Sequence, residues 1–372
     1  MIRMLIVAGG SGGHIFPAFA LTEEMEKRRD SLKIMLVISG RPAEIKIIEY
    51  MKKKIRNLKI YIVPVFPLRE GEGVFHWSVF LFRFIRWSIY SFLLTLLFRP
   101  CIVVGFGGIL SLPLILSASL LRIPTLIHEQ NVYPGKANLL LAHFAQKVAL
   151  SFEDSKHYFK NKSKLIVTGN PLRPDLKVIE REEALRRLGL EPSFFTLLIL
   201  GGSQGATSIN RYFVNLWKNF KQEDLGFQVI HITGLKDWHW VSEKYREINI
   251  TAKLFSFYEE MEVIYSASDL VIGRAGAATL NEISFFAKPA IIIPYPYAEQ
   301  HQLHNALYYL KKGGILLLEE KDLAQDKTRD FIYKIIKDRE KQGLLSREIK
   351  KINNPFATKL LADVVEGILF LN

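Results

Sequence analysis

The stretch that decides the fold is residues 269–306, which read DLVIGRAGAATLNEISFFAKPAIIIPYPYAEQHQLHNA. The apolar runs Leu270–Ile272 and Ala290–Ile293 are short and uninterrupted, as buried parallel strands are. Helical spacing of apolar residues follows in Thr279–Phe286, and a second helix is predicted over His301–Leu310. Two strand-to-helix turns therefore open on one edge of a sheet, which is where doubly wound domains bind ligands.

Polar residues follow these two turns. Backbone N–H groups at the start of a helix suit a phosphate. Glu282 lies one turn into the first helix, where it could accept hydrogen bonds from a ribose diol. Gln302 can both donate and accept hydrogen bonds nearby. The residues alone allow two interpretations of this stretch. One is a ligand site, and the other is an ordinary βαβ unit that carries a surface glutamate.

Length and composition indicate a two-domain globular protein. The chain has 372 residues, of which 49% are hydrophobic and 23% charged. The single cysteine, Cys101, excludes an internal disulfide and a cysteine-based zinc cluster. Met1–Ala8 runs directly into a strand, so no signal peptide is expected. The net charge of +13 favours anionic partners, but no nucleic-acid-binding signature accompanies it, so nucleic acid is not expected as a partner.

The first sixty residues predict a parallel doubly wound sheet. Strands are expected at Met4–Val7, Lys33–Ile38 and Lys59–Val63, with helices between them. The pattern restarts in the second half with a strand at Phe195–Leu200 and another glycine-containing loop. Two prolines followed by the charge-rich stretch 177–187 mark a domain boundary between the halves.

The apolar segment Val74–Phe98 is long enough to raise the question of a membrane-spanning helix. Arg83 and Arg86 interrupt it, each at a cost of roughly 2.5–3.5 kcal/mol at a bilayer centre. The segment also lies between two strands of one sheet. We therefore predict a crossover helix whose C-terminal part packs on the sheet and whose N-terminal part dips into an anionic membrane surface. The competing interpretation places all of its aromatic residues in the core.

The glycine loops at residues 9–13 and 201–205 match neither of the common nucleotide motifs. No Gly-Lys-Ser/Thr follows either loop, and neither forms a complete dinucleotide fingerprint. No suitable acidic residue ends the second strand, where Ser39-Gly40-Arg41 stands, so a nicotinamide enzyme is disfavoured. Both loops still allow a close approach of an oxyanion to the backbone. We expect two phosphate-bearing substrates.

Two residues compete for the role of general base. His14 closes the first loop at the start of a helix, and Glu129 follows another strand. Either could be purely structural, His14 by bonding the backbone and Glu129 by capping neighbouring N–H groups. Asn131 could orient the base or bind a sugar hydroxyl, and Arg173 could clamp a phosphate. No metal is expected, since the paired histidines of the 301–310 helix lack a third strong ligand.

Seven motifs, in order along residues 5–315, together resemble one family. They are Gly9–His14 with Pro17-Ala18, Gly105–Gly108 with Ser111 and Pro113, His128–Asn131 with Gly135 and Asn138, Val167–Pro171 with Arg173, Gly201–Ala206 with Asn210, Arg274–Ala277 with Thr279 and Glu282, and His301-Gln302 with Asn305-Ala306. The chain resembles the MurG family, the peptidoglycan N-acetylglucosaminyltransferases that convert lipid I into lipid II.

The resemblance implies a GT-B fold. Two Rossmann-like doubly wound domains would face each other across a cleft, and the C-terminal helix would cross back to the first domain. Residues 1–169 with 356–372 would form the acceptor-binding, membrane-associating domain. Residues 170–355 would bind the donor, UDP-N-acetylglucosamine.

The resemblance also assigns roles to single residues. The base would be His14 or Glu129. The donor would contact Ser11, Gly12, Gly13, Asn131, Arg173, Ser203, Ala277, Ala278, Thr279, Glu282, His301 and Gln302. The acceptor pyrophosphate would lie on Gly12, Gly13, Gly107 and Gly108. The membrane patch would comprise Phe75, Trp77, Phe80, Arg83, Phe84, Arg86 and Trp87.

The implied chemistry is an inverting hexosyl transfer without a cofactor or metal, at the cytoplasmic face of a bacterial membrane. The C4 hydroxyl of the N-acetylmuramoyl unit of lipid I would attack the donor's anomeric carbon. Three alternatives remain at this point: a transferase for another lipid such as diacylglycerol, a sugar-nucleotide epimerase, and a non-catalytic nucleotide-sugar-binding subunit.

Overall fold

The chain divides into two compact units. The computed structural model describes residues 2–10, 12–55, 58–63, 74–201, 205–218, 226–248, 250–297, 300–323 and 325–370. The first unit comprises Met1–Pro174 and Phe356–Asn372, and the second comprises Asp175–Pro355. The sequence-based boundary after residue 169 precedes the observed one, because the proline-containing segment 170–174 belongs to the first unit.

The first unit is built on a seven-stranded parallel sheet in the order β3-β2-β1-β4-β5-β6-β7. Its strands are β1 (Ile2–Val7), β2 (Leu32–Ile38), β3 (Leu58–Ile62), β4 (Ile102–Gly105), β5 (Thr125–Glu129), β6 (Lys147–Leu150) and β7 (Leu165–Val167). The strand order reverses between β1 and β4. The carboxyl ends of these two strands therefore form the switch point at which such sheets bind ligands.

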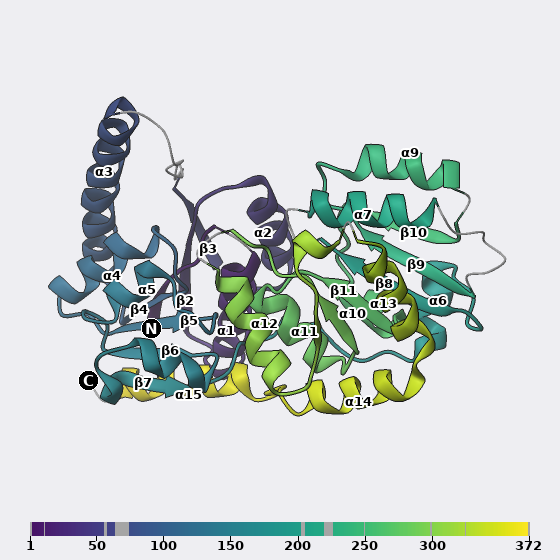
Figure 1. The fold of residues 1–372 in the computed structure, drawn as a ribbon. Coiled ribbons are helices and arrows are strands. Elements are labelled where there is room, and N and C mark those ends of the chain that lie inside the picture. The colour runs from purple at the N-terminus through teal and green to yellow at the C-terminus, as the bar shows by residue number, and fades with distance from the viewer. Residues whose placement is uncertain are drawn as a thin grey trace. The chain divides into compact units, whose positions relative to one another are not determined.

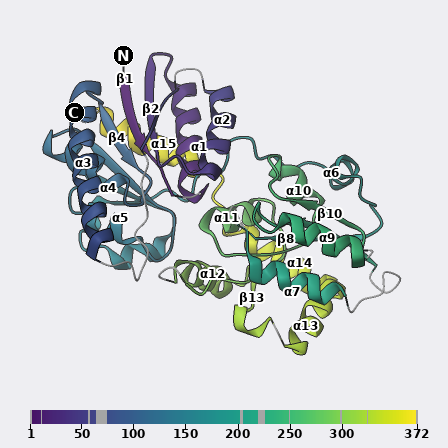
Figure 2. The ribbon, with the colours of Figure 1, turned by 90° about the horizontal axis from the view of Figure 1, so that it is seen from above.

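Helices cover both faces of this sheet (Figures 1 and 2). One face carries α1 (Gly12–Arg28), α2 (Pro42–Lys54) and α15 (Ala357–Phe370), and the other carries α3 (Val74–Phe98), α4 (Ser111–Leu120) and α5 (Lys136–Leu141). The 3-10 turns η1 (Glu153–Tyr158) and η2 (Lys162–Lys164) precede β7. The alternation of β1 separates the two cores: Met4 and Ile6 belong to the first, and Leu5 and Val7 to the second.

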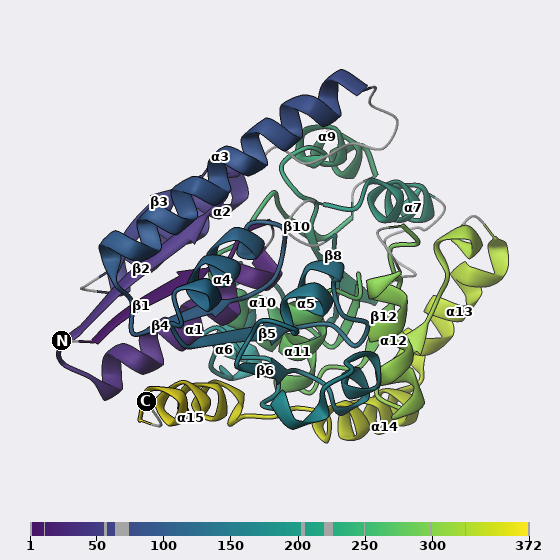
Figure 3. The same cartoon turned by 90° about the vertical axis from the view of Figure 1, so that its left-hand side faces the viewer.

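The C-terminal helix α15 returns to the first unit, as predicted (Figure 3). Leu361, Val365 and Ile368 are buried at helical spacing and join the core that α1 shares with the sheet. Arg28 at the end of α1 donates to Asp363 at 2.7 Å and to Glu366 at 2.9 Å. Apolar burial and these ion pairs together fix the end of the chain to its beginning.

The second unit repeats the design with a six-stranded parallel sheet in the order β10-β9-β8-β11-β12-β13. Its strands are β8 (Phe195–Leu200), β9 (Phe227–Ile232), β10 (Ala252–Phe255), β11 (Leu270–Gly273), β12 (Ala290–Ile292) and β13 (Leu316–Leu317). Its helices are α6 (Arg181–Leu188), α7 (Thr207–Trp217), α9 (Trp238–Ile248), α10 (Met261–Ala267), α11 (Ala277–Phe285), α12 (His301–Lys311), α13 (Asp326–Lys337) and α14 (Arg339–Lys350), with the 3-10 turn η3 (Glu320–Asp322). The switch point here lies between β8 and β11.

Helices α6, α9 and α14 were missed by the sequence analysis. The charge-rich stretch interpreted as a boundary is α6, which buries only Ala184, Leu185 and Leu188. Helix α9 buries only Val241 and Tyr245. A helix that buries so few apolar residues gives a weak periodic signal.

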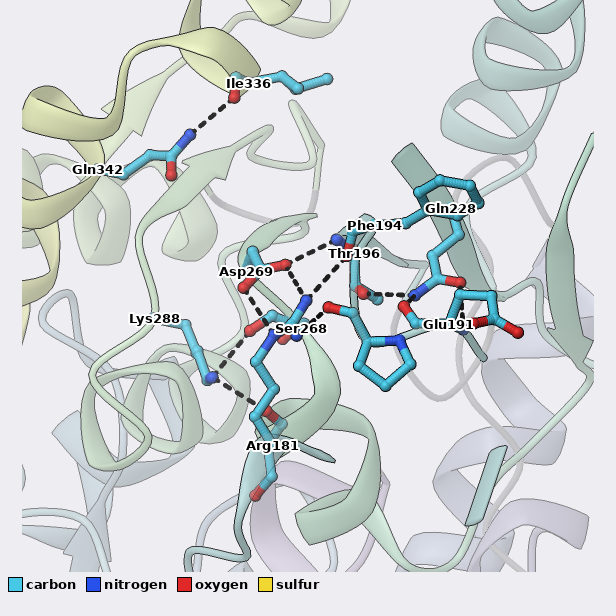
Figure 4. Close-up of polar contacts among 12 residues, drawn as sticks. Arg181, Glu191, Phe194, Thr196, Gln228, Ser268, Asp269, Lys288, Ile336 and Gln342 are labelled. Atoms are coloured by element: carbon cyan, nitrogen blue, oxygen red, sulfur yellow. Dashed lines mark hydrogen bonds and ion pairs between the residues drawn. The ribbon is translucent and has the colours of Figure 1, made fainter. Parts of the chain in front are cut away.

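A polar network closes the amino-terminal edge of the second sheet (Figure 4). Arg181 of α6 forms a two-pronged ion pair with Asp269, at 3.0 and 2.8 Å, and Asp269 also accepts from the Thr196 N–H at 2.7 Å. Lys288 donates to the Ser268 carbonyl at 2.8 Å, and burial lowers its pKa to about 8. The loops that carry the predicted site residues leave the sheet at the opposite, carboxyl edge.

Helix α3 exposes much of its apolar surface. Its segment Ser78–Phe98 is, among the described residues, the stretch that is long and apolar enough to cross a membrane by length and composition. The side chains turned inward are Trp87, Ser91 and Thr95. The exposed large apolar side chains are Leu81, Phe82, Ile85, Ile89, Tyr90, Leu93, Leu96 and Leu97. Leu94 and Phe98, in the C-terminal part of the helix, pack against the core on this side of the sheet, while the opposite face of the helix is exposed.

Candidate active site

The first glycine loop places His14 at the switch point of the first sheet. The loop leaves β1, and α1 begins at Gly12, so Gly12 and Gly13 form the first turn of a helix. The His14 Nδ1 lies 2.7 Å from the Gly9 carbonyl oxygen. A carbonyl can only accept, so Nδ1 carries the proton and the neutral ring keeps its lone pair on Nε2.

A second glycine turn lies against this histidine. Gly107 and Gly108 have φ values of +93° and +76°, which favour glycine. A Cβ on Gly107 would lie 3.5 Å from the His14 Nε2 and 3.3 Å from the Asn138 Nδ2, and a Cβ on Gly108 would lie 3.2 Å from the Gly9 oxygen. The absence of a side chain at Gly107 leaves the space beside the His14 Nε2 free of this turn's own atoms.

Glu129 ends β5 and is saturated with hydrogen bonds. Its Oε1 accepts from the backbone and side-chain nitrogens of Asn131, at 2.9 and 3.2 Å. Its Oε2 accepts from the Gly135 N–H at 3.0 Å and from the Asn138 amide at 2.8 Å. The side chain is only 1% exposed. This arrangement favours the capping role over the role of base, because a base needs an oxygen that the substrate can reach.

The neighbouring His128 is fully buried and joins β5 to the end of the sheet. Its Nε2 donates to the Gly169 carbonyl at 3.1 Å, and its Nδ1 accepts from the Gln130 amide at 3.0 Å. Burial lowers its pKa to about 4, so the ring is neutral at physiological pH. Gln130 also donates to the Phe106 carbonyl, which ties this strand to the Gly107 loop.

Arg173 is buried within the first unit. Only 7% of it is exposed, and its guanidinium lies 4.5 Å from the centre of the Phe16 ring on α1. Stacking on an aromatic ring holds the planar group in one orientation. Ser11 of the first loop, which the resemblance assigns to the sugar donor, lies outside the described residues.

In the second unit, Glu282 lies on α11 directly after the switch point. It is 8% exposed, and its Oε2 accepts from the Tyr265 hydroxyl at 3.0 Å. Tyr265 is itself buried and stacks on Phe286, with 5.1 Å between the ring centres. A rigid buried tyrosine thus holds the carboxylate. The sequence analysis did not identify Tyr265, since its hydroxyl approaches from the preceding helix.

The start of α11 contributes backbone rather than side chains. Gly276 precedes the helix, and Ala277, Ala278 and Thr279 form its first turn. The first N–H groups of a helix have no partners within it. Small side chains in this turn leave those N–H groups accessible to an anion.

Gln302 lies in the first turn of α12 and holds two loops together. Its side-chain oxygen accepts from the Ala275 N–H at 3.1 Å and from the Tyr295 N–H at 3.0 Å. The oxygen is therefore fixed, and the amide nitrogen must point the other way as a donor. His301 is partly exposed at the start of the same helix.

Arg274 braces the loop between β11 and α11. It donates to the Ser208 hydroxyl at 2.9 Å and to the carbonyls of Ile293 and Pro294, and it pairs with Glu320. Its Nη1 and Nη2 groups are thus engaged within the protein. These contacts favour a role in shaping the loop.

The glycine loop after β8 is held by a buried polar network. A Cβ on Gly205 would lie 2.6 Å from the Thr233 oxygen, so only glycine fits. Asn210 donates to the same oxygen at 2.9 Å and accepts from His231 at 3.0 Å. Burial lowers the pKa of His231 to about 3, and its other nitrogen accepts from the Tyr245 hydroxyl at 2.8 Å. Ser203, predicted to meet phosphate, lies outside the described residues.

The predicted membrane patch needs one correction. Trp87 belongs to the core, with 8% exposed, because it faces α4 and its Nε1 lies 3.4 Å from the Leu110 carbonyl. Arg83 and Arg86 are exposed, whereas Phe80 and Phe84 are half-buried and stack on each other. The side chains of Phe75 and Trp77 lie outside the described part of the structure. In the described ranges, no three His, Cys, Asp or Glu side chains gather to hold a metal.

Two doubly wound units, each with a glycine turn and a helix start at its switch point, are typical of nucleotide-sugar glycosyltransferases. The chain belongs to glycosyltransferase family 28. The model of the family's N-terminal domain matches residues 4–150, and that of its C-terminal domain matches residues 196–362.

Similar proteins extend over the whole chain. A protein of Halothermothrix orenii is 35% identical and one of Desulforamulus reducens is 34% identical, and 98–99% of each chain is covered. Both carry the name UDP-N-acetylglucosamine--N-acetylmuramyl-(pentapeptide) pyrophosphoryl-undecaprenol N-acetylglucosamine transferase.

Among solved structures, MurG of Acinetobacter baumannii has a TM-score of 0.73 at 22% identity, covering 98% of this chain and 99% of that one. A putative UDP-N-acetylglucosamine 2-epimerase of Listeria monocytogenes has a TM-score of 0.70 at 12% identity, covering 100% of this chain and 97% of that one. These two likenesses concern the fold alone, which is the two-domain GT-B architecture predicted from the sequence.

Proposed function

We propose that the chain transfers N-acetylglucosamine from UDP-N-acetylglucosamine to the lipid-linked N-acetylmuramoyl-pentapeptide, lipid I, and thereby makes lipid II for peptidoglycan. The observation that carries this function is the match of both domains, end to end, to proteins named for that reaction. The same names do not favour the alternative of a diacylglycerol-type acceptor. The epimerase alternative rests on shared fold only.

The donor is proposed to bind the second unit. Glu282, held by Tyr265, would accept hydrogen bonds from the ribose hydroxyls. The first turn of α11 would hold the diphosphate, since its N–H groups and the helix dipole both favour negative charge. Gln302 would donate its amide hydrogens to the sugar hydroxyls, because its oxygen is already engaged. Ser203 and His301 are proposed to complete this site.

The acceptor and the proton are proposed to be handled by the first unit. The acceptor pyrophosphate would lie on the N–H groups of Gly12, Gly13, Gly107 and Gly108. The C4 hydroxyl would lose its proton to the His14 Nε2 as its oxygen bonds to the anomeric carbon. The bond to UDP would break at the same time, with its electron pair leaving on the diphosphate oxygen. The product is a β-1,4 linkage, and Asn131 and Arg173 are proposed to contact the donor from this side.

The exposed apolar face of α3 is proposed to enter an anionic membrane surface at the cytoplasmic face of the cell membrane. Large apolar side chains along the helix are exposed, while the small polar Ser91 and Thr95 are buried. A helix whose outer face contacts water has the opposite distribution, with polar side chains outside and apolar ones inside. Arg83 and Arg86 are exposed on the same helix, where they could reach lipid phosphates. The acceptor is lipid-linked, so an enzyme held at that surface would meet its substrate there.

Vesicle sedimentation tests the membrane proposal. Arg83→Ser with Arg86→Ser should weaken binding to phosphatidylglycerol-containing vesicles by roughly thirtyfold, at about 1 kcal/mol for each arginine. Arg246→Ser on α9 is the matched control, since it removes an exposed arginine from the second unit. Equal binding of all three proteins would contradict the proposal.

Turnover with UDP-N-acetylglucosamine and a short-chain lipid I analogue tests the reaction. Wild type should release UDP only with the acceptor present. Glu282→Ala should raise the donor KM at least tenfold, because a charged hydrogen-bond acceptor is lost. His14→Ala should lower kcat by about 100-fold or more. Donor binding without any transfer to the analogue would refute the acceptor assignment.

A further inference from the structure

A buried carboxylate lies beneath the first glycine loop and has no role in the function described so far. Glu44, in the first turn of α2, is 1% exposed. Its Oε1 accepts from the Gly10 N–H at 2.6 Å and from the Ser39 hydroxyl at 2.6 Å. Its Oε2 accepts from the Gly40 N–H at 2.8 Å and from the Arg41 N–H at 3.3 Å. Among these bonds, the one from the Arg41 N–H is the one that caps α2.

The bond to Gly10 reaches beyond the helix cap. The Gly10 N–H and the Gly9 carbonyl belong to one planar peptide group. The N–H of that group donates to Glu44, and its carbonyl accepts from the His14 Nδ1 at 2.7 Å. A single peptide therefore connects a buried carboxylate to the histidine ring.

The following peptide is fixed from the same side. Arg41 donates from Nη1 to the Gly10 carbonyl at 2.8 Å. Gly10 has a φ of +105°, a conformation that glycine adopts readily and other residues rarely do. Both polar groups of Gly10 are thus held by the segment after β2, and the orientation of the Gly9–Gly10 peptide is determined by Glu44 and Arg41 together.

We infer that Glu44 is a positioning residue for the reaction, which sets the proton and the orientation of His14 through the Gly9–Gly10 peptide. The inference rests on the proposed function, in which His14 is the base. Glu44, the Gly9–Gly10 peptide and His14 would then form a hydrogen-bonded relay, in which Glu44 itself does not contact the substrate.

Each link of the relay has a chemical consequence. Donation to a carboxylate polarises the peptide and makes its carbonyl a stronger acceptor. A stronger acceptor holds the proton on Nδ1, so Nε2 stays free to take the proton of the attacking hydroxyl. When that transfer makes the ring an imidazolium, the polarised carbonyl stabilises the new charge. The proton remains on Nε2, and no proton crosses the peptide.

A double-mutant cycle tests the inference: wild type, Glu44→Gln, His14→Ala and the double variant. Glu44→Gln keeps the shape of the side chain and removes its charge. We expect its kcat to fall about tenfold, with the Kd for UDP within twofold of wild type. In the His14→Ala background, Glu44→Gln should have no further effect on kcat, because the residue through which it acts is gone.

Asp338→Asn is the control for simple loss of a helix-capping carboxylate. Asp338 caps α14 by accepting from the Lys341 N–H at 2.8 Å, and its replacement should leave kcat unchanged. Nitrogen-15 spectra of the histidines provide a second readout. The His14 signals, identified by their loss in His14→Ala, should report the Nδ1–H form in wild type and a mixture of both tautomers in Glu44→Gln.

Two outcomes would overturn the inference. One is an equal loss of kcat from Glu44→Gln with and without His14, which would mean that Glu44 only supports the fold. The other is a Glu44→Gln protein with wild-type kcat and unaltered His14 signals. A wild type that releases no UDP with the acceptor would refute the proposed function instead, and the spectra would still test the link between Glu44 and His14.

Discussion

The substitution Glu129→Gln tests whether Glu129 is a structural residue or the general base. A structural role predicts a large loss of stability, whereas the role of base predicts a large loss of kcat. Glutamine has the same shape, but one of the two carboxylate oxygens becomes an NH₂ group. Each oxygen of Glu129 accepts two N–H groups, at distances from 2.8 to 3.2 Å. Two partly or wholly buried donors therefore lose their acceptor, and each costs about 1–3 kcal/mol. We expect the free energy of unfolding to fall by roughly 2–6 kcal/mol.

Urea denaturation of wild type and Glu129→Gln measures this loss, and turnover well below the melting temperature measures the chemistry. The folded Glu129→Gln protein should keep kcat within about tenfold of wild type, whereas His14→Ala should lose at least 100-fold. The reasoning would be refuted by a Glu129→Gln protein that is as stable as wild type and as inactive as His14→Ala. Glu129 would then be the base.

Three further predictions concern the loops and the buried histidines. Gly107→Ala should lower kcat about tenfold or more, because its methyl group would lie against the His14 Nε2 and the residue would have to keep a positive φ; wild-type turnover would contradict this. Gln302→Glu keeps the accepting oxygen and removes the amide donor, so the donor KM should rise about tenfold while the Kd for UDP, which lacks the sugar, stays unchanged. His128 and His231 have folded-state pKa values near 4 and near 3, below the unfolded value of 6.5. The free energy of unfolding should therefore be greatest above pH 6.5 and should fall as the pH drops toward 4, by about 1.4 kcal/mol per pH unit for each histidine. Replacing either histidine by glutamine should make the urea-denaturation midpoint depend less on pH.

The sequence by itself determined the class of fold and the edge of the sheet that carries the site. Uninterrupted apolar runs such as Leu270–Ile272 mark buried parallel strands, and the glycine turns that follow them mark the carboxyl edge. These signals are local, since they depend on neighbours within a few positions along the chain. For the same reason the C-terminal helix, with Leu361, Val365 and Ile368 on one face, could be predicted as a helix.

Only the tertiary structure decided which polar residues act on which. Glu44 and Gly10 are 34 positions apart, and Tyr265 and Glu282 are 17 apart, so no local pattern links either pair. The sequence also left two candidates for the base, with His14 preferred over Glu129. The fold distinguishes them by partners: four donors occupy the carboxylate, while one carbonyl fixes the imidazole and leaves its other nitrogen toward the glycine turn. Hydrogen bonding depends on distance and direction in space, which the order of residues does not specify until the sheet brings the strand ends together.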